Sequence, residues 1–94
     1  MRKLRRKQRV KLGQRVFRYT VVIERESDPE FEGYYNAYVP ALPGCVSYGK
    51  SEQEALANIR EAIASYLLSI LDEGESPPQD ISPEIKTVTI EVSV

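Results

Sequence analysis

The sequence predicts a single α+β domain in which an antiparallel sheet, of element order βββαβ, packs on one long helix. Residues 51–74 repeat apolar side chains at steps of three and four, as an amphipathic helix does, and four shorter stretches have the alternation or turn signals of strands. A chain of 94 residues is enough for one domain, and such a chain buries only about 60 to 65% of its unfolded surface. We therefore expect an oligomer, which would bury more.

The first two predicted strands form a hairpin. Residues 16–26 alternate a strongly apolar face with a mixed one, and residues 34–39 resume this alternation after a turn at 27–30. Pro40 and Pro43 end the second strand, because proline has no N–H for the sheet and restricts the residue before it.

The third strand, residues 45–49, is short and leads directly into the helix. Ser51 is a good N-cap and Glu54 lies three residues later, which predicts a capping box where each side chain accepts the other's free backbone N–H. The helix is expected to end at Gly74, which favours a left-handed C-cap, and the prolines at 77–78 cannot continue it. Its buried stripe is predicted to consist of Leu56, Ile59, Ile63, Tyr66, Leu67 and Ile70.

A fourth strand is predicted at the end of the sequence. Residues 87–94 alternate valine and isoleucine with polar side chains, after a rigid proline-containing connector at 77–80. A strand at a terminus usually lies at a sheet edge, and an uncharged edge invites pairing with another chain. This strand is therefore one expected route to an oligomer.

Composition excludes several classes of function. The chain contains no histidine and one cysteine, Cys45, so an intrachain disulfide, the usual zinc sites, a Ser/His/Asp triad and histidine acid/base chemistry are not available. It also shows no secretory leader and no long apolar run, which predicts a cytoplasmic protein that does not enter a membrane. We expect no cofactor.

Charge divides the sequence near residue 18. The first 18 residues hold nine of the thirteen Lys and Arg and none of the fourteen Asp and Glu, although the whole chain has a net charge of −1. We expect residues 1–15 to form a basic arm, disordered or extended, beside a domain at 16–94. The arm is a candidate contact for nucleic acid phosphates; a solvated tail, or one folded back on acidic protein surface, are the alternatives. The candidate cations are Arg2, Lys3, Arg5, Arg6, Lys7, Arg9 and Lys11.

Two features give weak support for a metal-binding or catalytic role. Glu24 and Glu26 share a strand face, where they could bind a cation such as magnesium, but a solvated segment needs such charges as well. Cys45 follows a Pro-Gly turn and is better explained as a small buried hydrophobe than as a reactive thiol. The sequence therefore predicts a protein that holds no metal and is not an enzyme.

One part of the sequence resembles a known family. Residues 33–49, the helix start at 51–63 and the segment 66–78 closely resemble the HicB-like antitoxins, and the match covers about residues 17–80. It is specific, because a Leu-Pro-Gly-Cys turn, a glycine two residues before the N-cap and a Glu-Ala-Leu-x-Asn helix start occur in order. The matching positions, expected to be structural, are Leu42, Pro43, Gly44, Cys45, Gly49, Ser51, Glu54, Ala55 and Leu56.

The resemblance implies a fold similar to part of a ribonuclease H domain, without the catalytic carboxylates of that fold. It also implies an antitoxin that docks on a small HicA-like toxin, an mRNA-cutting ribonuclease of the double-stranded-RNA-binding type, and masks its active site. Three tyrosines are candidates for an aromatic contact surface, or else complete the core. The expected toxin contacts are Tyr34, Tyr38 and Tyr48, with Glu30, Glu32, Asp72 and Glu73 for charge complementarity.

The sequence departs from the family in one respect. Many members have a C-terminal helix-turn-helix or ribbon-helix-helix module for operator DNA, whereas this sequence ends at Val94 without room for one. The basic arm is a candidate substitute. The alternative function is therefore a stand-alone oligomeric nucleic-acid-binding protein that uses the arm and has no toxin partner.

Overall fold

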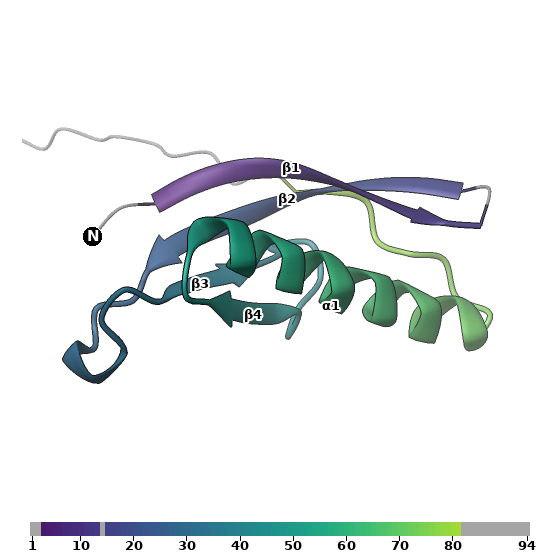
Figure 1. The fold of residues 1–94 in the computed structure, drawn as a ribbon. Helices are drawn as coiled ribbons and strands as arrows, with labels where there is room; N and C mark the ends of the chain where they lie inside the picture. The colour runs from purple at the N-terminus through teal and green to yellow at the C-terminus, as the bar shows by residue number, and fades with distance from the viewer. Residues whose placement is uncertain (1–2, 14, 82–94) are drawn as a thin grey trace, which may run out of the picture.

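A four-stranded antiparallel sheet packs with one face against one long helix in the computed structural model, which describes residues 3–13 and 15–81 (Figure 1). The strands follow chain order across the sheet, so each strand pairs with the next one along the chain. The α+β fold class is confirmed, and the predicted strand at 87–94 lies outside the described residues. The elements are β1 (Lys3–Leu12), β2 (Arg15–Arg25), the 3-10 helix η1 (Pro29–Phe31), β3 (Tyr35–Tyr38), β4 (Val46–Gly49) and α1 (Glu52–Asp72).

The basic segment expected to form an arm outside the domain is instead the first strand of the sheet. β1 pairs with β2 along its whole length, and the two strands are joined by a turn in which Gly13 has a φ of +59°. Gln8 and Val10 are buried on the side of α1, whereas Lys7 and Arg9 point outward. The segment is extended, as one of the two expected states, but charge alone did not indicate that it joins the sheet, because one face of β1 carries apolar side chains and β2 supplies its hydrogen-bond partners.

The hydrophobic core lies between α1 and the inner face of the sheet. The helix contributes four fully buried positions one turn apart, as the three- and four-residue spacing predicts. Leu56 and Tyr66 of the predicted stripe are only partly buried and pack at its margin. The buried cluster consists of Val10, Tyr19, Val21, Ile23, Ala37, Val39, Ala41, Leu42, Cys45, Ala55, Ile59, Ile63 and Leu67.

Both ends of α1 are capped by the residues that the sequence predicts. The Ser51 hydroxyl accepts a hydrogen bond from the Glu54 N–H at 3.0 Å, whereas the Glu54 carboxylate accepts from the Lys50 N–H at 3.2 Å rather than from Ser51. The return half of the capping box is therefore shifted by one residue. At the other end Gly74 has a φ of +76°, and its N–H donates to the Leu71 carbonyl, as in a Schellman motif.

The Leu-Pro-Gly-Cys motif forms the tight connection between β3 and β4. The Cys45 N–H donates to the Leu42 carbonyl at 3.0 Å, with Pro43 and Gly44 (φ +82°) at the central positions, as in a type II turn. The Tyr66 hydroxyl of α1 donates to the Pro43 carbonyl at 3.0 Å. Cys45 is buried, and this burial raises the pKa of its thiol, so the prediction of a small buried hydrophobe is confirmed.

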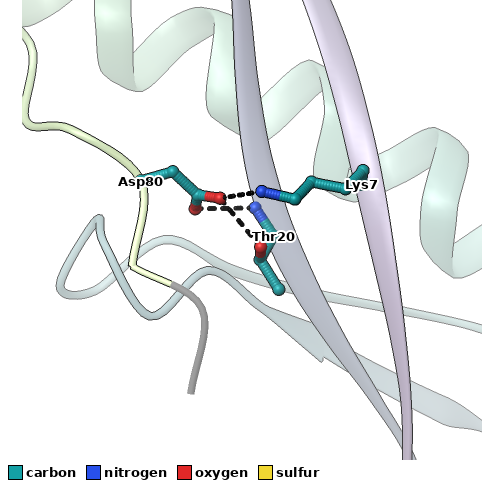
Figure 2. Close-up of polar contacts among 3 residues, drawn as sticks. All are labelled: Lys7, Thr20 and Asp80. Carbon is teal, nitrogen blue, oxygen red and sulfur yellow. Dashed lines mark hydrogen bonds and ion pairs between the residues drawn. The ribbon is translucent and has the colours of Figure 1, made fainter. Parts of the chain in front are cut away.

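After α1 the chain returns along β2 (Figure 1). There it supplies a hydrogen-bond acceptor to the part of β2 that does not pair with β3. β3 ends at Tyr38, opposite Val22, so the Thr20 N–H has no strand partner on that side. Figure 2 shows how Asp80 replaces it: its carboxylate accepts from the Thr20 N–H and hydroxyl, both at 2.8 Å, and from the Lys7 ammonium at 2.5 Å. Asp80 thus fixes the returning segment to β1 and β2.

Replacing Asp80 with asparagine is expected to lower the free energy of unfolding by about 2 kcal/mol, because one neutral acceptor oxygen remains for three donors. Burial raises the pKa of the Asp80 carboxyl, but the hydrogen bonds from Lys7 and Thr20 lower it more, so its pKa lies below the usual 3.8. A carboxyl with a depressed folded pKa stabilises the fold fully above its unfolded pKa, and the contribution is lost as pH falls through the folded value.

Urea unfolding at about pH 6 and at a pH below the folded pKa of Asp80 measures this contribution directly, because the carboxyl is ionised in the first condition and protonated in the second. The wild type and Asp80→Asn should differ at the higher pH and converge at the lower one. Asp72→Asn is the control, since Asp72 is exposed at the end of α1. A difference that is equal at both pH values would show that the Asp80 charge does not hold the segment.

Candidate protein-docking site

An exposed aromatic hollow lies at one end of the sheet, beside η1. It has a volume of about 400 Å³ and is lined by Glu26, Phe31, Tyr34, Asn36 and Tyr48. The Phe31 and Tyr34 rings meet nearly edge to face, with centroids 6.0 Å apart, and the Tyr34 and Tyr48 centroids are 6.2 Å apart. Because Phe31 is 49% exposed and Tyr48 64% exposed, the rings form a surface that water contacts.

Strand register places this hollow on the face of the sheet opposite α1. Asn36 of β3 lies directly across from Tyr48 of β4, and their neighbour Ala37 is buried in the core. Successive side chains of a strand point to opposite faces, so Asn36 and Tyr48 share the outer one. Gly33, with a φ of +87°, turns the chain from η1 into β3 and brings Phe31 beside Tyr34.

Glu26 supplies a fixed negative charge at the wall of the hollow. Its carboxylate accepts from the Asn36 side-chain amide at 2.7 Å and from the backbone N–H groups of Ser27 and Asp28. These hydrogen bonds, the one from Asn36 first, lower the pKa of Glu26. Its oxygens are therefore occupied by donors, and the described residues contain no group of three or more His, Cys, Asp or Glu placed to hold a metal ion.

The three predicted tyrosines are only partly brought together. Tyr34 and Tyr48 line the hollow, whereas Tyr38 lies on the same face of β3 but outside it, opposite Val46. Phe31 is not predicted as a contact residue from the sequence, because it lies in a turn rather than in an alternating strand. Its one signal was a large apolar residue inside an otherwise polar segment.

The four predicted acidic contacts do not form one surface. Glu30 and Glu32 belong to η1 and its C-cap, next to the hollow, and both are exposed. Asp72 and Glu73 lie at the C-terminal end of α1, at the opposite end of the molecule (Figure 1). A partner that covers the aromatic hollow would therefore meet the first pair of acids and not the second.

Strand alternation also divides the predicted basic contacts. Arg5, Lys7, Arg9 and Lys11 lie on the outward face of β1, with Lys7 bound to Asp80 as described above. Arg6 belongs to the other face and lies 3.9 Å from Glu52 of α1. Lys3 is described only by its backbone, as the partner of Glu24 in β2, and Arg2 lies outside the described residues.

The described residues thus define a small α+β domain with an acidic aromatic hollow at one end of its sheet and a row of cations along one edge strand. No helix of the described segments is both long and apolar enough to cross a membrane. Residues 19–91 match the family described as HicB_like antitoxin of bacterial toxin-antitoxin system. The chain belongs to this family.

Relatives of the chain share much of its sequence. It is 47% identical to a UPF0150 protein of Thermoplasma acidophilum over 68 residues, which cover 72% of this chain and 93% of that one. It is 40% identical to a UPF0150 protein of Synechocystis over 65 residues, which cover 69% of this chain and 77% of the relative. No solved structure matches the chain, so the likeness to part of a ribonuclease H fold stays a prediction.

Proposed function

We propose that this chain is an antitoxin that neutralises a HicA-type mRNA-cleaving toxin by covering its active site, and that the aromatic hollow is the docking surface. Membership of an antitoxin family supports the role. The observation that supports the surface is the set of three rings in which Phe31 and Tyr48 are exposed and each packs against the half-buried Tyr34 between them.

The physical chemistry of the rings suits a protein partner. Each aromatic side chain buries about 150–250 Å² when covered, with few rotatable bonds to immobilise. Tyr34 lies between Phe31 and Tyr48, so its ring is already held in place before a partner arrives. Such preorganised aromatic anchors are where binding energy concentrates in protein interfaces.

The charge around the hollow suits a basic partner. Glu26 lies in its wall, and the exposed acids Asp28, Glu30 and Glu32 surround it in the η1 segment. A ribonuclease that binds RNA presents a basic surface, so this rim would speed encounter and set the orientation of docking. The cations of β1 would repel the same partner, which favours docking at the β3–β4 side of the sheet.

Charge reversal at the two acidic pairs tests where the toxin docks. The double variant Glu30→Lys and Glu32→Lys is expected to weaken association with the toxin about 30-fold, because cations would then face a basic partner. The matched control is Asp72→Lys with Glu73→Lys, which makes the same change in net charge at the other end of the molecule and should leave association within about 2-fold.

The measurement is co-expression with a HicA-type toxin, sought first in the reading frames next to this gene, followed by pull-down, binding kinetics and rescue of growth. Loss of rescue only in the Glu30 and Glu32 variant supports docking at the hollow. Loss only in the Asp72 and Glu73 variant would move the docking site to the end of α1. Absence of any complex with the unaltered chain would contradict the antitoxin role.

A further inference from the structure

The outward face of the β1–β2 hairpin is a strongly basic surface that lies outside the aromatic hollow. Four of its cations lie at alternate positions of β1, so they share one face, and a fifth lies across from them on β2. We propose that this face binds the phosphate backbone of a nucleic acid duplex, in addition to the proposed antitoxin role. The basic row consists of Arg5, Lys7, Arg9, Lys11 and Arg18.

The geometry of β1 suits a repeating anionic partner. Alternate residues of a strand are about 6.8 Å apart, so the four cations of β1, from residue 5 to residue 11, follow one another at regular steps over about 20 Å. Because β1 is hydrogen-bonded to β2 along its length, the row is rigid and its charges are held in line. A shallow hollow of about 350 Å³ runs beside it, and Arg60 of α1 adds a further cation to its lining.

The row includes an unfavourable contact that an anion would relieve. Arg9 lies directly opposite Arg18 in the β1–β2 register, and like charges at such a position destabilise a sheet. Lys7 is neutralised by Asp80 and Arg6 by Glu52, but no carboxylate of the described segments pairs with Arg9 or Arg18. Of the five cations in the row, only Lys7 has a carboxylate partner among the described residues, so the other four do not hold the fold through ion pairs.

A nucleic acid backbone suits this row better than an acidic protein surface does. Four of the five cations follow one strand at a regular spacing, as phosphates follow a duplex, whereas protein carboxylates have no such regular order. The row contains no aromatic side chain for stacking on bases, so binding should depend on the backbone and be independent of base sequence. Duplex DNA and duplex RNA offer the same phosphates, and the experiment includes both.

The test is fluorescence anisotropy of a labelled duplex of about 20 base pairs of mixed sequence, as DNA and as RNA, with the full chain. The four cations that pair with no carboxylate of the described segments, Arg5, Arg9, Lys11 and Arg18, predict an affinity that falls about 100-fold between about 50 and 200 mM salt. Arg9→Glu with Lys11→Glu should weaken binding at least 10-fold and flatten the salt dependence. Folding should be retained, since Glu at position 9 would face Arg18 as an opposite charge.

The matched control is Arg25→Glu with Lys50→Glu, two exposed cations outside the row, which gives the same net charge. It should bind the duplex within about 2-fold of the unaltered chain. Equal weakening by both pairs, or no binding of either duplex by the unaltered chain, would overturn the proposal. If the unaltered chain binds neither duplex, and the Arg9 and Lys11 variant loses self-association on size-exclusion chromatography, the row would instead be a contact with a second copy of the chain. Because neither pair touches the aromatic hollow, toxin binding should survive in both variants.

Discussion

Gly49→Ala should lower the free energy of unfolding by about 3 kcal/mol, because the added methyl group has no space. A Cβ at this position would lie 2.4 Å from the Ala55 nitrogen and 2.8 Å from the Glu54 carbonyl carbon. Both are backbone atoms in the first turn of α1, so neither moves without displacing the helix from β4. Gly49 is therefore the residue that lets the last strand and the helix approach one another.

Urea denaturation monitored by circular dichroism measures this effect, with Gly44→Ala as the control. Gly44 has a φ of +82° and open space around its Cα, so alanine there adds only the conformational strain of about 1 to 2 kcal/mol. Gly49→Ala should cost more than Gly44→Ala. The reverse order would show that β4 and α1 are further apart than the geometry indicates.

How much of the fold the sequence predicts depends on how local each signal is. α1 was predicted to within a residue at its start, because Ser51 and Glu54 lie beside the turn they cap. β1 was missed because its strand character comes from pairing with β2, and its charge alone indicates an unstructured segment. Asp80 was missed for a related reason, since its partner Thr20 lies 60 residues away in sequence.

In the aromatic hollow too, the sequence predicted the residues with a local signal and missed those brought in by the fold. Tyr34 and Tyr48 were found because they belong to extended segments with a clear alternation of side chains. Phe31 joins them only through the turn of η1 and Gly33, a geometry that no periodicity in the sequence describes. The grouping of Asp72 and Glu73 with these residues rested on charge alone, and the length of α1 separates them from the hollow.

Phe31→Ser with Tyr48→Ser is expected to weaken inhibition of the toxin about 1,000-fold, because two central aromatic anchors typically contribute at least about 2 kcal/mol each. Both side chains are largely exposed, so their removal should leave the free energy of unfolding nearly unchanged. Leu68→Ser is the control, since Leu68 is 50% exposed on α1, away from the hollow. Inhibition that survives loss of both rings would exclude the hollow as the docking surface.

The most direct test of the proposed function is RNA cleavage by the purified toxin, titrated with this chain and with the variants above. Masking of the active site predicts that cleavage falls in proportion to added chain and stops when the toxin is saturated. It also predicts that the Phe31 and Tyr48 variant shifts the titration to far higher concentration. Cleavage that continues at saturating concentrations of a chain shown to bind the toxin would contradict the claim that this domain covers the toxin's working surface.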